Sequence, residues 1–183
     1  MSIKLETPLT EEKIKDLKIG DEILLNGTIY TARDAAHKKL VDLLKENKIL
    51  PFDPEGSVIF YVGPSPAQPG KVIGAAGPTT SYRMDPFVNS LLKVGMKGMI
   101  GKGERSKEVI DGIKKYCAVY FGATGGAAAL LSKSIVEAKV IAFDELGPEA
   151  IRKLKVKDMP LIVINDCKGN DLYVEGQKKW TKV

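Results

Sequence analysis

Ser57-Val58-Ile59-Phe60-Tyr61-Val62 is a short, continuous apolar run of the kind that is typical of a buried strand. A proline-rich loop over residues 64–70 follows it and is expected to cross between two elements. Strands are further predicted at residues 117–121, 140–143 and 161–165, and helices from about Asp85 and over 106–115. Strands that alternate with helices predict an α/β fold, either three-layered or a sheet covered by helices, with parallel pairing in its second half.

Signals near the two ends of the chain predict further elements. Residues 20–30 are expected to form a β-hairpin around Asn26-Gly27, a dipeptide that favours tight turns. A helix should begin near Thr31, with Thr31 as its capping residue. Pro148 suits the first turn of a helix between the last two strands named above. Residues 172–174 are predicted to form a final strand.

Length and charge limit the classes of protein to consider. With 183 residues, of which 44% are hydrophobic, the chain can bury one core, so a single domain over residues 1–183 is expected. The net charge of +5 reflects 28 basic against 23 acidic residues spread along the chain, which permits nucleic-acid binding without implying it. The densest basic cluster is interleaved with Leu154 and Val156 and should form a solvated face beside a buried edge. It consists of Arg152, Lys153, Lys155 and Lys157.

The sequence has few features that would predict a membrane span, a disulfide framework or a metal site. No window approaches the roughly 18 apolar residues of a membrane span, and residues 1–8 lack the apolar core of a leader, so a cytoplasmic protein is expected. Cys117 and Cys167 are isolated from each other and predict no disulfide framework. Together with the single histidine, His37, they cannot build a structural zinc site or a four-cysteine cluster.

The segment Gly77-Pro78-Thr79-Thr80-Ser81-Tyr82-Arg83-Met84-Asp85-Pro86 places three hydroxyls and a guanidinium just ahead of a predicted helix. Asp85 is expected to be the N-cap, and Pro86 fits the first helical position. Because a helix N-terminus carries partial positive charge, Arg83 beside it predicts an anionic ligand such as a carboxylate or phosphate. The alternative is an ordinary loop with a surface arginine.

Two other segments have a similar character. Arg33 falls in the first turn of the helix expected from Thr31, which is the unfavourable end for a cation. Either an anionic ligand or the neighbouring carboxylate of Asp34 should compensate it. Lys102 lies between Gly101 and Gly103, whose lack of side chains would let the ammonium approach a ligand closely, although a plain glycine turn is an alternative.

A glycine-rich segment, residues 121–130, follows the predicted strand at 117–121 and opens an alanine-rich stretch. Its spacing, Gly-x-x-Gly-Gly, departs from the dinucleotide-binding pattern, so a tight strand-to-helix turn is the better interpretation.

Four of these segments together resemble one family. Residues 31–37 (TARDAAH), 77–85 (GPTTSYRMD), 101–103 (GKG) and 121–128 (FGATGGAA) are similar, in order, to the β subunit or C-terminal region of iron–sulfur hydro-lyases, namely class I fumarase and L-tartrate dehydratase. The Gly-Pro-Thr-Thr segment with its Arg-Met is the most specific element. The resemblance implies a swivelling β/β/α domain with a mixed, partly parallel sheet flanked by helices.

The resemblance also implies a reaction, the reversible addition of water across a carbon–carbon double bond, as in fumarate to (S)-malate. It implies a [4Fe–4S] cluster held by three cysteines of an α subunit, with one iron left open as a Lewis acid. This chain would supply the other half of the site in a hetero-oligomer, and the resemblance suggests α₂β₂. By similarity Arg33, Arg83 and Lys102 would hold a C4 dicarboxylate with the help of Thr80.

Thr79 is implied by the same resemblance as the base at C3, a role that demands strong activation because a threonine hydroxyl is a poor base. Thr80 or Ser81 could instead be the reacting hydroxyl. His37, one helical turn after Arg33, would orient a carboxylate or else simply pack. Fumarate is the expected substrate, and L-tartrate and mesaconate are the alternatives. A rival from another class is a basic module that binds anions or nucleic acid without catalysis.

Overall fold

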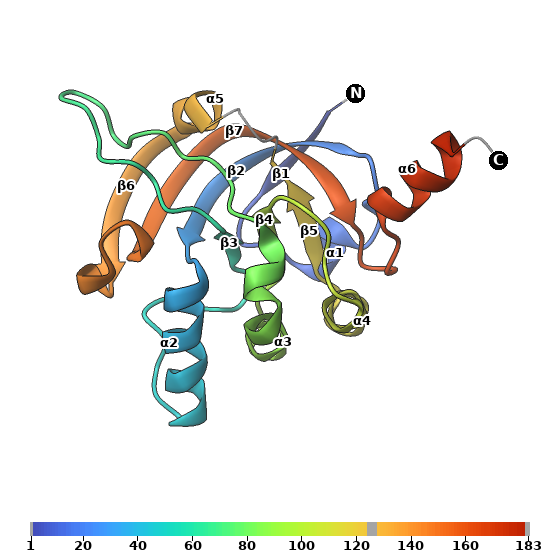
Figure 1. Cartoon of the computed structure of the whole chain (residues 1–183), viewed down its shortest axis with the longest axis horizontal. Coiled ribbons are helices and arrows are strands. Elements are labelled where there is room, and N and C mark those ends of the chain that lie inside the picture. Colours follow the sequence, from blue (N-terminus) through green and yellow to red (C-terminus); the bar gives the residue numbers. More distant parts are fainter. Residues whose placement is uncertain (1, 124–127, 182–183) are drawn as a thin grey trace.

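The computed structural model describes residues 2–123 and 128–181 and has a strongly curved sheet with helices packed around it (Figure 1). The strands are β1 (Ile3–Glu6), β2 (Glu22–Thr31), β3 (Val58–Phe60), β4 (Gly98–Gly101), β5 (Val119–Gly122), β6 (Ile135–Ala142) and β7 (Ile151–Asn165). The α-helices are α1 (Glu11–Ile14), α2 (Asp34–Lys45), α3 (Asp85–Lys93), α4 (Lys107–Tyr116), α5 (Ala128–Lys133) and α6 (Leu172–Trp180). Two 3₁₀ segments, η1 (Ser81–Met84) and η2 (Asp144–Glu149), complete the list.

The seven strands form one sheet in the order β1-β2-β3-β4-β5-β7-β6, and an extra antiparallel pairing of β2 with β7 closes its centre into a ring. Neighbours from β1 to β5 are parallel, whereas β7 runs antiparallel to β2, β5 and β6. The predicted α/β fold with a mixed, partly parallel sheet is therefore confirmed. Parallel pairing was expected in the second half of the chain, where β4 and β5 are indeed parallel, but the parallel part already begins with β1 and β2, and the last two strands, β6 and β7, are antiparallel.

Side chains along the short central strands point alternately to the two faces of the sheet, and each face has its own hydrophobic core. Val58 and Phe60 point into the closed sheet, where a first cluster gathers, whereas Ile59 points the other way. Tyr120 of β5 faces the same way as Ile59, into a second cluster with α2, α3 and α4. Figure 1 shows these three helices together on one side of the curved sheet. Parallel strands that are covered on both faces have apolar residues at consecutive positions. This explains the continuous apolar run at residues 57–62.

The hairpin predicted over residues 20–30 is wrong. Residues 22–31 form one continuous strand, β2, and the Asn26-Gly27 pair marks a bulge in its pairing with β7. Gly27 has φ +101°, and a side chain there would overlap the Thr7 hydroxyl and come within 3.1 Å of the Thr7 carbonyl oxygen. The left-handed glycine is thus used to bring another segment close instead of to reverse the chain.

The elements near the C-terminal end need three corrections. Residues 172–174 begin the helix α6, because the Asp171 side chain accepts a hydrogen bond from the Tyr173 amide and caps a helix there. The helix expected around Pro148 is the 3₁₀ segment η2, in which Gly147 interrupts the helical backbone. The strand predicted at 140–143 is the end of β6, which lies at the edge of the sheet and pairs with β7; Val140 is exposed there, and residues 141–143 are half-buried against the second core. By contrast, the helix over 106–115 is confirmed, with Ser106 capping α4.

Among the described helices, none has the length and apolar character that crossing a bilayer would need.

Candidate functional site

The predicted site residues gather where parallel strands end. Arg33 comes shortly after β2 in the sequence, and Lys102 directly after β4. The amide of Thr79 donates a hydrogen bond to the carbonyl of Tyr61, the residue that directly follows β3. Because the carboxyl ends of neighbouring parallel strands meet at one edge of a sheet, these segments share that edge, where α/β folds commonly bind ligands. We call the surface formed there by Arg33, Thr79, Thr80, Arg83 and Lys102 the rim.

Arg33 is the N-cap residue of α2 and is already paired with carboxylates. Its Nη2 lies 3.1 Å from Glu149 Oε1 and 3.5 Å from Asp34 Oδ1. The prediction that Thr31 caps this helix is wrong. Thr31 lies in β2, where its hydroxyl donates to Ala150 O and accepts from the Arg152 amide. The compensation predicted for Arg33 is thus present within the chain.

Arg83 lies in η1 and is joined to Arg33 through a shared carboxylate. Its Nη2 is 2.6 Å from Asp34 Oδ2. The Arg83 side chain is 43% exposed, compared with 22% for Arg33. Arg83 therefore offers more side-chain surface to a ligand from solution than Arg33 does.

The hydroxyl segment and the lysine segment lie side by side. Thr80 forms an isolated parallel bridge with Lys102, and the Ser81 amide donates to Lys102 O at 2.9 Å. The Thr79 amide donates to Tyr61 O at 2.6 Å. Lys102 is exposed, and Thr79 and Thr80 are half-buried. Ser81 is completely buried, and its Oγ lies 2.9 Å from the Tyr120 hydroxyl, so it is unsuited to act as the reacting hydroxyl.

Sequence reasoning missed a buried ion pair behind the rim. Arg105 Nε donates to Asp85 Oδ1 at 2.8 Å, and the Arg105 side chain is fully buried. Asp85 is the first residue of α3 and not its N-cap, which is Met84. Its Oδ2 instead accepts from the Ser106 amide at the start of α4. The two partners are 20 positions apart, so no local pattern could have indicated the pair.

His37 is buried and packs against Tyr61. It is fully buried; its Nδ1–H donates to Arg33 O at 2.9 Å, and its ring meets that of Tyr61 edge-on. Burial is the main cause that lowers the pKa of His37 to about 4, so the ring is neutral at physiological pH. Of the two alternatives, the packing histidine is the one that this environment fits.

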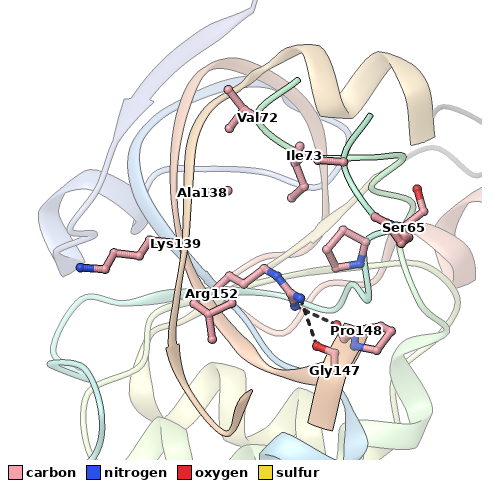
Figure 2. A pocket seen from close by; sticks show the side chains of 12 residues that line it. Ser65, Val72, Ile73, Ala138, Lys139, Gly147, Pro148 and Arg152 are labelled. Atoms are coloured by element: carbon pink, nitrogen blue, oxygen red, sulfur yellow. Dashed lines mark hydrogen bonds between the residues drawn. The ribbon is translucent and has the colours of Figure 1, made fainter. Parts of the chain in front are cut away.

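A pocket of about 370 Å³ opens between the proline-rich loop, β6 and η2 (Figure 2). The guanidinium of Arg152 reaches into this region but donates to the carbonyls of Gly147 and Pro148, both at 3.0 Å. None of the five predicted site residues is among those that line the pocket. Beyond Arg152, the basic cluster has the predicted pattern, with Lys153, Lys155 and Lys157 exposed and Leu154 and Val156 buried.

The cysteines do not lie with the rim. Cys117 precedes β5 and Cys167 follows β7, and the pairing of Tyr120 with Asn165 places both near the amino end of β5. A [4Fe–4S] cluster with one open iron needs three cysteine thiolates, and this chain has two cysteines. Within residues 2–123 and 128–181, no group of three or more potential ligands for a metal ion comes together. These residues therefore do not fit a cluster. Of the glycine-rich segment, residues 124–127 lie outside the described part of the chain.

Comparisons with known proteins point to one family. A family model described as the fumarase C-terminus matches residues 1–176. A Methanocaldococcus jannaschii protein, provisionally named an L(+)-tartrate dehydratase subunit beta, is 43% identical over 177 residues, which cover 93% of this chain and 91% of that protein.

Longer relatives are fumarate hydratases. Fumarate hydratase 2 of Leishmania major is 38% identical over 94% of this chain, and the aerobic class I fumarate hydratase of Escherichia coli is 37% identical over 96% of it. The chain spans only 31% and 33% of the length of these two proteins. The match over residues 1–176, supported by both kinds of relative, shows that the chain belongs to the fumarase C-terminus family, a family of hydro-lyase domains and subunits.

Proposed function

We propose that this chain is the β-type half of an iron–sulfur-dependent hydro-lyase that interconverts fumarate and (S)-malate. The single observation that carries the proposal is the convergence of the three predicted cations and the two threonines on one rim. Arg33 and Arg83 share the Asp34 carboxylate there, and Thr80 pairs with Lys102. Four-carbon dicarboxylates carry two negative groups a few ångströms apart, which suits a rim with cations on separate segments.

In this proposal Arg83 and Lys102 bind the carboxylates directly. Both are exposed, whereas Arg33 is held by Glu149 and Asp34 and would mainly orient the shared carboxylate. Charge-assisted hydrogen bonds from guanidinium and ammonium groups are about twice as strong as neutral ones. The same cations would stabilise the negative charge that develops when a proton leaves the carbon next to a carboxylate.

Thr79 would remove that proton at its Oγ1 and return it in the reverse reaction. Its backbone is fixed by the short bond to Tyr61 O, and the burial of Ser81 leaves Thr79 and Thr80 as the hydroxyls near the rim's surface. A threonine hydroxyl needs activation, for which nearby cations are suited, because positive charge favours its deprotonated form.

The rest of the site would belong to an α partner, in a cytoplasmic heteromer for which we propose α₂β₂ stoichiometry. The described residues do not fit a cluster, and the fumarate hydratase relatives are about three times as long as this chain, which leaves room in them for the missing half. When bound by the partner, a [4Fe–4S] cluster would supply a Lewis acid for the substrate hydroxyl.

L-Tartrate is the second candidate substrate. The observation that favours it is the 43% identity with the M. jannaschii protein, which is matched over 91% of its length. Tartrate is also a four-carbon dicarboxylate, so the same cations would bind it, and the choice would depend on groups near the second hydroxyl.

The test is reconstitution under anaerobic conditions. The chain should be co-expressed with a candidate α partner that has three cluster cysteines, and kcat/KM should be measured for fumarate, L-tartrate and mesaconate. We expect hydration of fumarate by the pair and none by either chain alone. A cluster-loaded pair that is inactive on all three acids would overturn the proposal, and a preference for L-tartrate would select the second candidate.

A further inference from the structure

A buried chain of hydrogen bonds lies directly behind the rim and joins the two segments that carry the proposed ligands. Tyr120 OH donates to Gly103 O at 2.9 Å. Because a hydroxyl has a single proton to donate, the 2.9 Å contact between Ser81 Oγ and Tyr120 OH must have Ser81 as its donor. Ser81 and Tyr120 are fully buried, so water cannot replace these bonds. One phenol therefore fixes the Ser81 hydroxyl against the carbonyl that follows Lys102.

The ring of Tyr120 is itself held in place by Arg105. The guanidinium carbon of Arg105 lies 4.9 Å from the centre of the Tyr120 ring and 5.4 Å from that of Tyr61. The bond from Arg105 to Asp85 fixes the loop after β4 to the first residue of α3, two positions beyond Arg83. Tyr61 in turn holds Thr79 through its carbonyl. The segments of Thr79, Arg83 and Lys102 thus share one buried support.

Burying the charged and polar groups of Arg105, Asp85, Ser81 and Tyr120 has a free-energy cost, so this cluster calls for an explanation other than net stability. Taking a guanidinium out of water is costly, and a buried ion pair is often no more stabilising than apolar residues of the same volume. The hydroxyl bonds are directional, and placing a reacting group wrongly by about 1 Å can cost roughly 100-fold in rate. Geometry is therefore the better explanation of this buried polar cluster than net stability.

We propose that Tyr120, supported by Arg105, is a positioning residue that fixes Lys102 relative to Thr79, Thr80 and Arg83. It touches no substrate and acts through the Ser81 hydroxyl and the Gly103 carbonyl. The inference rests on the proposed function for its catalytic consequence, whereas the structural coupling can be measured in the chain alone.

The test compares Tyr120→Phe with a matched control, Tyr116→Phe. Tyr120→Phe keeps the ring beneath Arg105 and removes only the bridging hydroxyl. Tyr116 is the last residue of α4, is partly buried, and its hydroxyl makes no hydrogen bond with any described residue. A second variant, Ser81→Ala, breaks the same chain of bonds from its other end.

The first readout is amide hydrogen exchange in the full-length chain. The amide of residue 81, which donates to Lys102 O, should lose at least tenfold of its protection against exchange, relative to the intrinsic rate of each sequence, in Tyr120→Phe and Ser81→Ala, and its protection should be unchanged in Tyr116→Phe. Unchanged protection at residue 81 in both variants would overturn the inference whatever the activity of the complex.

The second readout is kcat/KM of the reconstituted pair in a double-substitution cycle with Lys102→Met. Tyr120→Phe should lower kcat/KM about tenfold on its own and less than about twofold once Lys102 is already replaced, because its effect passes through the lysine. Equal losses in both backgrounds would mean a general structural role and would overturn the inference. Inactivity of the wild-type pair on all three acids would overturn the proposed function instead, and hydrogen exchange would then decide the positioning role by itself.

Discussion

Asp34 Oδ2 lies 2.6 Å from Nη2 of Arg83, although the two residues are 49 positions apart. The other oxygen of the same carboxylate faces Arg33 at 3.5 Å. One carboxylate therefore links the start of α2 to η1 and sets the distance between two of the cations that the sequence pattern singles out. It also neutralises part of their charge, whereas Lys102 forms no ion pair with any of the described residues.

The first prediction concerns this link. Asp34→Asn keeps the shape of the side chain but removes its charge, so Arg83 keeps at most a neutral hydrogen bond in place of its ion pair. We expect KM for the dicarboxylate to rise roughly tenfold because the guanidinium is held less firmly in place. The pair is partly exposed, so the free energy of unfolding should fall by no more than about 1 kcal/mol.

Steady-state kinetics of the reconstituted pair and urea unfolding of the chain check both parts. Glu149→Gln is the matched control, since it removes a carboxylate from Arg33 without touching Arg83. A decrease of KM in Asp34→Asn would contradict the tether and would mean that Asp34 competes with the substrate for Arg83.

The second prediction separates the two threonines. Thr79→Val removes the proposed base at nearly constant volume and should lower kcat by roughly 100- to 10,000-fold, the range of a general acid–base group. Thr79→Ser should retain a measurable part of kcat because it keeps the hydroxyl. Thr80→Val is the control and should affect mainly KM. If Thr80→Val abolishes kcat and Thr79→Val does not, the roles are reversed.

Parts of the fold were predictable because their signals are local. The apolar run at 57–62 became β3, and Ser106 caps α4 where its sequence indicated. The failures have physical reasons. Residues 172–174 have side chains that favour strands, but the Asp171 cap determines a helix. The Asn26-Gly27 pair is a turn signal in isolation, whereas here the close approach of Thr7 requires the glycine.

The candidate site divides in the same way. Local spacing pointed to Arg33, Arg83 and Lys102 and suggested Asp34 as a partner for Arg33. It could not indicate that Asp34 also pairs with Arg83, because that contact depends on which strands are neighbours in the sheet. The Arg105–Asp85 pair was missed for the same reason.

The third prediction tests Lys102. Lys102→Met removes an exposed charge and should reduce kcat/KM roughly 100-fold, in line with the loss of a charge-assisted hydrogen bond to a carboxylate. Stability should not change, since surface substitutions usually stay within about 0.5 kcal/mol. Lys153→Met, an exposed lysine on β7, is the charge-matched control and should leave kcat/KM unchanged. Equal losses in the two variants would point to a long-range effect of net charge instead of a contact.

The fourth prediction is a pH dependence of stability. Burial lowers the pKa of His37 from near 6.5 in the unfolded chain to about 4 in the folded chain. Between these values the unfolded state binds more protons, so the stability present above pH 6.5 is lost as the pH falls toward 4. The expected loss is about 3 kcal/mol.

Urea unfolding of wild type and His37→Leu at pH 7 and pH 4.5 measures this loss. The Arg33 carbonyl keeps a partner in the variant, because it also accepts from the amide of residue 37. The variant should lose roughly 2 kcal/mol less than wild type over this interval, because at pH 4.5 the titration of the folded chain is not yet complete. Parallel pH profiles of the two proteins would show that other groups cause the acid sensitivity.

The fifth prediction uses two glycines with opposite surroundings. At Gly101 a methyl group would overlap the Ser81 hydroxyl and lie 2.9 Å from Tyr61 Cδ2. Gly101→Ala must therefore displace Ser81 and Tyr61, which lie behind the rim. We expect it to destabilise the chain by about 1–3 kcal/mol and to lower kcat/KM. Gly176 lies inside α6 with nothing within 4 Å of an added Cβ, so Gly176→Ala should stabilise that helix by up to about 1 kcal/mol and leave catalysis unchanged. Thermal unfolding and kinetics of the two variants decide the matter, and a Gly101→Ala chain with unchanged stability would mean that Ser81 can move aside without consequence.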